Sequence, residues 1–378
     1  MAATTAQTVP AQEAGRPQPQ TTVEPPGGPF LRHSQPGKGP LYNVSGSAFG
    51  ALITQPLVAK PGYLARIRVQ QTVTGGTGTT ATYGADSPYN LDSLIQLKDA
   101  FGTPLMNGPG YELIKLVSLY GLGGGALNGA NDPANLPSFS AFDTAGNGGF
   151  SYALPLEFVK AYGVLSAANA SLLPTLQFNL AAESAFYTAA PGGSPVVNTT
   201  VDADFYWLPE GSGSPEPPGL GTTRQWMLTQ ANPSVSANAS TRVAFPRLGG
   251  YLDTIIMEVR DSTGARTDGF WPSRLQLYVD GVPLIDSTMD GIYDDMWCAF
   301  GGVARPTGVV AFSRKTSLSQ AALGLLDTGE SWLATNPGTL LEANFAPAGN
   351  GSSGPAQVNV LVGQVVPTGS LIQGLPEV

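Results

Sequence analysis

The chain has 378 residues, enough for two domains of ordinary size, and 42% of them are hydrophobic. Its net charge is −9 and basic clusters are absent, which excludes direct sequence-specific binding of nucleic acid as its main task. The single cysteine, Cys298, and the single histidine, His33, leave too few groups for a disulfide framework, a zinc site or a catalytic triad, so the sequence predicts neither an enzyme nor a cofactor.

Residues 1–40 are expected to form an extended or disordered N-terminal arm. Gln, Pro, Thr and Gly dominate this segment, which buries too little apolar surface to offset the entropy of ordering. The arm could order by lying on a neighbouring molecule, with Phe30, Leu31 and Arg32 as candidate anchor residues, and a mobile tail is the alternative. The first residues lack the charged start and apolar core of a signal peptide, so we expect a soluble chain made in the cytosol.

A strand that occurs twice organises the rest of the chain. Residues 62–69 open with Gly-Tyr-Leu and then alternate in polarity, and residues 250–257 repeat this opening. Alternation with a period of two is typical of a strand with one buried face. Two copies so far apart predict two domains of one kind. An opening strand, Phe49–Val58, and a glycine-rich loop, Thr74–Thr80, are expected on either side of the first copy.

Each copy is followed by a predicted hairpin and a short helix. The first hairpin turns at Asp99–Gly102 and the second at Asp280-Gly281, and a Pro-Leu pair follows each turn. The helices are expected over Tyr111–Tyr120 and Ile292–Phe300, and a glycine suited to a helix C-terminus follows each. The first helix is predicted to bury one face.

Loops and closing strands complete the two halves. A long loop, Leu122–Gly149, follows the first helix only, and together with Thr74–Asn90 it is the candidate for an outward-facing segment. Each half then has an alternating strand, Thr175–Leu180 or Thr339–Phe345, and ends with an apolar strand before a Pro-X-Gly turn. The sequence therefore predicts an arm (1–40), a first β-domain (41–210), a Pro/Gly-rich linker (211–221), a second β-domain (222–369) and a C-terminal tail (370–378).

Carboxylates are the remaining candidates for chemistry. Asp202 and Asp204 would point to the same side of a strand, but a glycosidase needs two facing carboxylates at a set separation, which this spacing does not establish. Asp290, Asp294 and Asp295 lie around the second helix and are weak candidates for a metal site with calcium, although they lack the spacing of an EF-hand. A role as a helix cap explains Asp290 better.

Aromatic residues keep one alternative function open, a carbohydrate-binding or spike-type pair of β-sandwiches. Trp207, Trp226, Trp271 and Trp297 could form sugar platforms, but their strand and helix positions favour burial in a core. Charged residues are only 12% of the chain, and interface cores are depleted in them. This composition favours a protein that packs against copies of itself, and a secreted or thermotolerant β-protein is the alternative.

Together these features resemble the double jelly-roll major capsid proteins of tailless, membrane-containing icosahedral viruses of the tectivirus type. The matching features are the Pro/Gln-rich arm, the two tandem β-domains with equivalent Gly-Tyr-Leu strands, Pro-Leu hairpins and short helices, and the Pro/Gly linker, over about Leu41–Gly369. The resemblance implies an all-β fold of two tandem eight-stranded jelly rolls, with short helices in loops and an extended N-terminal arm.

The resemblance also implies a role and a set of partners. Three chains would form a homotrimer of pseudo-hexagonal outline, and the trimers would tile the shell of a virion after synthesis in the host cytoplasm. The implied partners are neighbouring capsid trimers, minor capsid or penton proteins, and an internal viral membrane near the arm. Arg16, Arg32 and Lys38 give the arm little basic charge for binding lipid headgroups.

Overall fold

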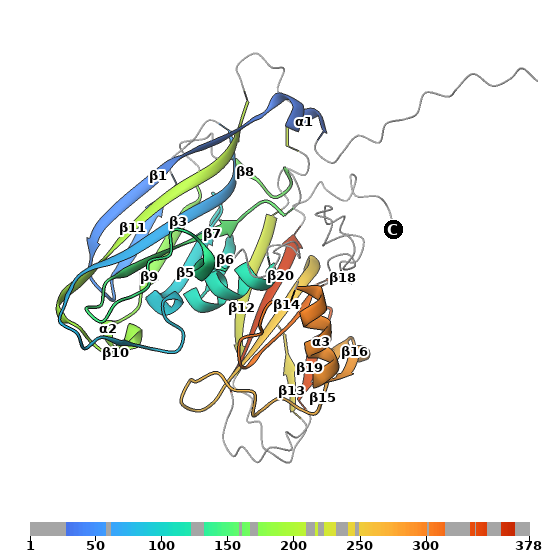
Figure 1. The fold of residues 1–378 in the computed structure, drawn as a ribbon. Coiled ribbons are helices and arrows are strands. Elements are labelled where there is room, and N and C mark those ends of the chain that lie inside the picture. The colour runs from blue at the N-terminus through green and yellow to red at the C-terminus, as the bar shows by residue number, and fades with distance from the viewer. Residues whose placement is uncertain are drawn as a thin grey trace, which may run out of the picture.

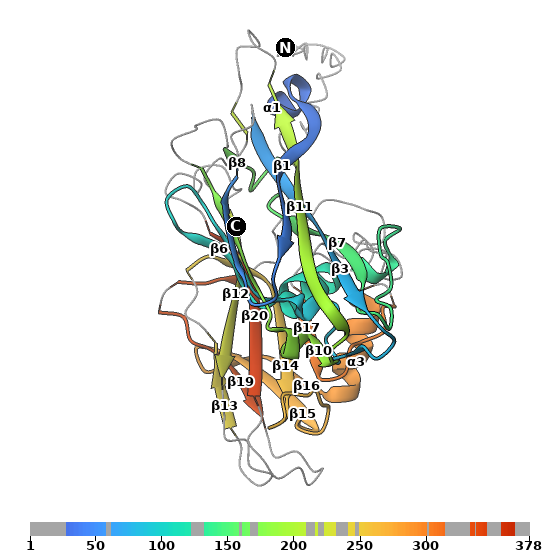
Figure 2. The same cartoon turned by 90° about the vertical axis from the view of Figure 1, so that its left-hand side faces the viewer.

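The computed structural model of the chain describes residues 28–57, 62–121, 132–158, 161–166, 173–208, 216–217, 223–231, 241–245, 249–300, 302–313, 333–336, 338–345 and 357–366. These residues form two β-rich units, one from each half of the chain, and Figures 1 and 2 show the units in contact. No helix in the described ranges is long and apolar enough to cross a bilayer.

The first unit is built from two layers of four strands. The strand order of one layer is β1 (Gln35–Ser47), β11 (Gly192–Trp207), β3 (Tyr63–Thr77) and β7 (Gly148–Pro155). The strand order of the other layer is β2 (Leu52–Pro56), β9 (Thr175–Leu180), β5 (Asp92–Lys98) and β6 (Pro104–Gly108). The connections hold the short elements α1 (Gly28–His33), β4 (Thr82–Tyr83), η1 (Tyr89–Leu91), η2 (Tyr111–Gly121), η4 (Pro133–Asn135), β8 (Leu165–Ser166), α2 (Glu183–Phe186) and β10 (Tyr187–Ala189).

The second unit repeats this arrangement. The strand order of its first layer is β12 (Thr223–Ala231), β20 (Gln357–Val366), β14 (Tyr251–Arg260) and β17 (Val309–Ser313). The strand order of its second layer is β13 (Thr241–Ala244), β19 (Leu341–Phe345), β15 (Arg274–Val279) and β16 (Val282–Thr288). Helix α3 (Met289–Ala299) follows β16, and the short strand β18 (Leu333–Ala334) pairs with β14.

Both units therefore have the same topology. When the eight main strands of each unit are counted along the chain, one layer has the order first, eighth, third, sixth and the other has the order second, seventh, fourth, fifth. This is the strand order of a jelly roll. The predicted fold, two tandem eight-stranded jelly rolls, is confirmed.

The repeated Gly-Tyr-Leu strands occupy the same place, because β3 and β14 are the third strand of each jelly roll. Each has a β-bulge directly after Leu64 or Leu252, where it pairs with the eighth strand. Steric crowding explains why both copies begin with glycine. A Cβ at Gly62 would lie 1.9 Å from the carbonyl oxygen of Tyr206, and a Cβ at Gly250 would lie 2.4 Å from the carbonyl oxygen of Val365. The two copies thus agree in backbone detail as well as in sequence.

The predicted hairpins are also confirmed. They join the fourth and fifth strands, β5 to β6 and β15 to β16, and each has a bulge next to its Pro-Leu pair. Asp280 and Gly281 have φ angles of 49° and 81°, the two positive values that a tight two-residue turn requires. The glycine-rich loop expected at Thr74–Thr80 is wrong in its first part, because β3 continues to Thr77.

The N-terminal boundary differs from the prediction. The arm was expected to reach Pro40, but α1 begins at Gly28 and β1 begins at Gln35, so the first strand of the first jelly roll begins within the predicted arm and continues beyond it to Ser47. The segment expected to open the fold, Phe49–Val58, contains the second strand instead. Residues 1–27 and most of the predicted linker lie outside the described residues.

The two short helices differ from each other. The first is a π-helix, η2, which is buried on nearly every side and not on one face only as predicted. Every residue of η2 is buried except Lys115, which is of intermediate exposure. The second, α3, begins at Met289 and buries only Met289, Ile292 and Met296. Of the long loop predicted after the first helix, residues 122–131 lie outside the described residues.

Candidate functional site

The three aspartates proposed as weak metal ligands do not gather into a site. Asp290, Asp294 and Asp295 are exposed along α3, and among the described residues no group of three or more His, Cys, Asp or Glu side chains could hold a metal ion. Asp290 is not the cap of this helix, because the side chain of Thr288 accepts the N–H of Gly291 there. Asp290 instead lies in the first helical turn, where its negative charge interacts favourably with the positive end of the helix dipole.

The predicted carboxylate pair on β11 belongs to a surface ion pair. Asp204 accepts two hydrogen bonds from Nε of Arg68, at 3.0 and 2.9 Å, and contacts its Nη2 at 2.8 Å. Asp202 lies on the same face of the sheet and is exposed. This pairing of a carboxylate with a cation differs from two facing carboxylates, the arrangement that glycoside hydrolysis needs.

The tryptophans divide between core and surface. Trp226 and Trp271 are buried, at 0% and 4% exposure, which confirms the interpretation as core residues. Trp207 and Trp297 are exposed, at 39% and 57%, so for these two the expected burial is wrong.

Phe30 is an anchor, but it binds its own chain. Its ring is 1% exposed and contacts the rings of Tyr63 and Tyr206 edge-on, each with centroids 5.6 Å apart. Leu31 is partly buried and Arg32 is exposed. The expectation that this segment orders by lying on a neighbouring molecule is therefore wrong for Phe30, which fixes α1 to the third and eighth strands of the first jelly roll.

Polar side chains from both units converge at the junction between the two jelly rolls. Its frame is a parallel pairing of β6 with β12, in which Trp226 lies opposite Met106 and Met227 opposite Asn107. One layer of each jelly roll thereby joins into a continuous sheet of order β17-β14-β20-β12-β6-β5-β9-β2. The first and second units are thus connected by backbone hydrogen bonds as well as by side chains.

Trp226 fills the space between the two units. A Cβ added at Gly121 of η2 or at Gly363 of β20 would lie 2.6 Å from its ring, so only glycine leaves room for the indole at these two positions. The guanidinium carbon of Arg224 lies 4.7 Å from the ring centroid, and Arg224 is ion-paired with the buried Asp253. A large apolar surface and a desolvated cation are thereby buried together at the junction.

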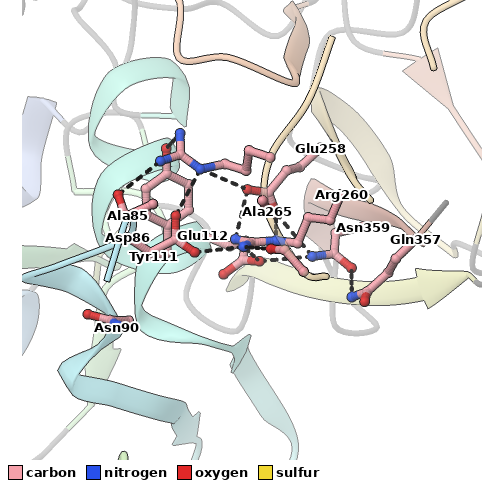
Figure 3. Close-up of polar contacts among 12 residues, drawn as sticks. Ala85, Asp86, Asn90, Tyr111, Glu112, Glu258, Arg260, Ala265, Gln357 and Asn359 are labelled. Carbon is pink, nitrogen blue, oxygen red and sulfur yellow. Dashed lines mark hydrogen bonds and ion pairs between the residues drawn. The ribbon is translucent and has the colours of Figure 1, made fainter. Parts of the chain in front are cut away.

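A cluster of charged side chains extends the junction (Figure 3). Arg260 of β14 binds Asp86 of the first jelly roll through Nη1 at 2.6 Å, and Arg266 binds the other oxygen of Asp86 through Nε at 2.8 Å. Arg266 also donates to the hydroxyl of Tyr111, at 2.5 Å, and its guanidinium lies 4.3 Å from that ring. Two cations from the second unit thus hold one carboxylate and one aromatic ring of the first.

Two carboxyl groups lie behind these cations. Glu258 of β14 accepts hydrogen bonds from Arg260, and the side-chain amide nitrogen of Asn359 donates to both Glu258 and Glu112, at 3.0 Å each. Burial raises the pKa of Glu112 to about 8; the neighbouring Glu258 adds to the rise, and Arg260 opposes it. The raised pKa of Glu112 favours its protonated form near neutral pH.

A cavity of about 530 Å³ lies beside the cluster, lined by side chains of both units such as Tyr89, Tyr111 and Arg266. Its other basic side chains are paired: Lys115 with Asp132, and Arg305 with Asp268 at 2.8 Å. Because each of these cations already has a carboxylate partner, the cavity is not arranged to bind an anion. The junction therefore has the features of a structural contact between the two units rather than of a reaction centre.

Comparisons with known proteins bear on the fold. Neither a scan of protein-family models nor a search of curated proteins found a match. Among solved structures, the crystal structure of the STIV MCP matches with a TM-score of 0.62 and 16% identity, over 91% of this chain and 100% of that chain. The structure of Sulfolobus Turreted Icosahedral Virus contains a chain that matches with a TM-score of 0.60 and 16% identity, over 88% of this chain and 91% of that chain.

PBCV-1 VP54, fitted into a cryo-EM reconstruction of the virophage Sputnik, matches with a TM-score of 0.59 and 12% identity, over 88% of this chain and 93% of that chain. These structural neighbours are double jelly-roll major capsid proteins. At such low identity the likeness shows a common fold, and it confirms the resemblance in architecture that the sequence predicted.

Proposed function

We propose that this chain is a major capsid protein, which assembles as pseudo-hexagonal homotrimers into an icosahedral shell around an internal membrane. The observation that carries the proposal is the duplicated jelly roll, which matches a capsid protein along that protein's whole length. In this role the chain is structural rather than enzymatic. The two jelly rolls are the two wall units of each subunit.

The junction supports this role. A trimer of a double jelly roll presents six similar units, and it approaches sixfold symmetry only if the two units of each chain keep one orientation. The β6–β12 pairing, the buried Trp226 and the Arg260–Asp86 ion pair restrict that orientation. A low content of charged residues, 12%, further suits a protein that is surrounded by copies of itself.

Partners follow from the same proposal. Neighbouring trimers would contact one another along the sides of the jelly rolls, and minor capsid or penton proteins would close the vertices. The N-terminal residues that precede α1 would lie toward the internal membrane. Synthesis would take place in the host cytoplasm, and the assembled protein would reside in the virion.

Size-exclusion chromatography with light scattering tests the proposal directly. We expect a trimer or a larger assembly at micromolar concentration, and negative-stain images should show particles of hexagonal outline. A stable monomer at that concentration would overturn the proposed function. Obligate interfaces of roughly 2,000 Å² or more would keep the trimer intact during chromatography.

A further inference from the structure

Two neighbouring cavities lie at the junction of the jelly rolls. The larger, of about 530 Å³, is the cavity beside the charged cluster, and the smaller has a volume of about 240 Å³. Val303 and Arg305, from the segment between α3 and β17, line both of them. The two cavities together, named here the junction cleft, fall in the size range of roughly 300–1,000 Å³ that small-molecule sites have.

The junction cleft lies at the end of the jelly rolls that is remote from α1. Helix α1, at the top of Figure 1, is held by Tyr63, the first residue of β3. Because β3 runs away from α1, the connection that follows it lies at the opposite end. The cleft is lined by connections that follow the third and fifth strands of each unit, namely residues 85–89, 111–119, 132–135, 266 and 302–306.

The cations of the junction cleft are each compensated by a carboxylate. The pairs are Lys115 with Asp132, Arg266 with Asp86, and Arg305 with Asp268. Asp294 of α3 adds one further carboxylate at the smaller cavity. The cleft therefore does not attract an anion, but its fixed charged groups can still exchange hydrogen bonds with a neutral ligand.

Tyrosine hydroxyls in the cleft have hydrogen-bonding capacity for a ligand. Tyr120 is 2% exposed and lines the smaller cavity, and its hydroxyl has no hydrogen-bond partner among the described residues. Burial raises the pKa of Tyr120, so this hydroxyl stays protonated and can donate as well as accept. The hydroxyl of Tyr111 accepts from Arg266 and can donate its own proton. A buried hydroxyl without a partner is destabilising, and a ligand that bonds to it removes that cost.

Aromatic rings accompany these polar groups along the cleft. Tyr89 and Tyr111 line the larger cavity, and Tyr120 and Tyr293 line the smaller one. A tyrosine combines an apolar ring with a polar tip. Rings and hydroxyls in alternation match a ligand with apolar faces and a periphery of hydroxyl groups, which is the chemistry of a sugar ring.

We propose that the junction cleft binds a neutral oligosaccharide. The unpartnered hydroxyl of Tyr120, the tyrosine rings and the compensated charges carry this inference. It goes beyond the proposed function, because forming a shell requires no ligand at this place. Only the direction of the cleft rests on that function, since residues that precede α1 would face the membrane and the cleft would face the exterior. A sugar bound to both jelly rolls stabilises the folded subunit by mass action.

Binding of defined sugars to the full-length protein tests the inference. The probes are neutral hexasaccharides of glucose, mannose, galactose and N-acetylglucosamine, with sialylated and sulfated glycans as the acidic comparison. Calorimetry measures the affinity, and the rise in melting temperature measures the stabilisation. We expect at least one neutral probe to bind and to raise the melting temperature. Failure of every neutral probe at millimolar concentration, or tighter binding of the acidic glycans, would overturn the inference.

Two variants locate the bound sugar. Ala304→Trp places an indole at an exposed position that lines the larger cavity and should abolish binding, whereas Thr54→Trp, at an exposed position of β2, should leave it unchanged. Tyr120→Phe removes the unpartnered hydroxyl and should weaken binding about threefold to tenfold without lowering stability. Unchanged affinity of Ala304→Trp or of Tyr120→Phe would overturn the placement of the sugar in the cleft.

Light scattering of the same samples separates this inference from the proposed function. A trimer that binds none of the neutral probes overturns the inference and leaves the proposed function standing. A monomer that binds one of them overturns the proposed function and leaves the inference standing.

Discussion

Replacing Glu112 with glutamine should make the protein less sensitive to alkaline pH. Glu112 is 2% exposed, and burial raises its pKa from 4.5 to about 8. The unfolded chain loses this proton near its ordinary pKa, whereas the folded chain keeps it to about pH 8. The native state therefore binds more protons between these two values, and stability falls as pH rises through that window.

The size of the effect follows from this proton count. One retained proton lowers the free energy of unfolding by at most about 1.4 kcal/mol per pH unit between pH 5 and 8. Glu112→Gln keeps a side-chain oxygen that can accept the hydrogen bond from Asn359 but carries no titrating proton. The variant should match the wild type near pH 5 and exceed its stability progressively up to pH 8.

Urea denaturation at intervals of one pH unit, at fixed protein concentration, measures this difference. Asp92→Asn is the matched comparison, because burial raises the pKa of Asp92 to about 7 within the first jelly roll rather than at the junction. Its advantage over the wild type should stop growing near pH 7, before that of Glu112→Gln. Parallel curves for Glu112→Gln and the wild type from pH 5 to 8 would refute the assignment of a protonated Glu112.

Three further predictions concern stability in urea at pH 7. Arg260→Met should lower the free energy of unfolding by about 3–5 kcal/mol, because it leaves buried carboxylates without their cation. Arg274→Met removes the arginine of an exposed ion pair, in which that side chain is 53% exposed, and should lower it by about 1 kcal/mol or less. Equal losses would contradict the role of the junction. Gly62→Ala and Gly250→Ala should each cost roughly 1–3 kcal/mol or more through the clash with a carbonyl oxygen, and a neutral effect would contradict the close approach. Phe30→Ala should cost about 3–5 kcal/mol, and unchanged stability would remove Phe30 as an anchor.

The fold was predictable because its signals are local. The alternation after Gly-Tyr-Leu and the Asp280-Gly281 turn each depend on a few neighbouring residues, and duplication doubled every signal. Strand β1 escaped prediction because it lies at a sheet edge, where Pro36 and Pro40 are tolerated and most side chains face solvent. A strand of this composition cannot be distinguished from an extended arm by its sequence.

The junction was missed for a different reason. Alternation in residues 250–257 indicated one buried face, yet β14 is buried on both. Arg260 meets Asp86 from the other jelly roll, a partner 174 positions away that no local pattern reveals. One signal was nevertheless present: Ile256 occupies the outward position that Arg68 occupies in the first copy. An apolar residue in place of a basic one at an outward position indicates that the second copy is covered there.

The continuous sheet through β6 and β12 has a consequence for how the chain can be divided. The two halves are held together by ladder hydrogen bonds, a buried indole and partly buried ion pairs, none of which depends on the peptide bonds between Leu208 and Thr223. A gene split within that interval should therefore yield two polypeptides that reassociate into the native subunit. The same interval would accept an inserted sequence, which under the proposed function would place the added sequence within each subunit rather than at its termini.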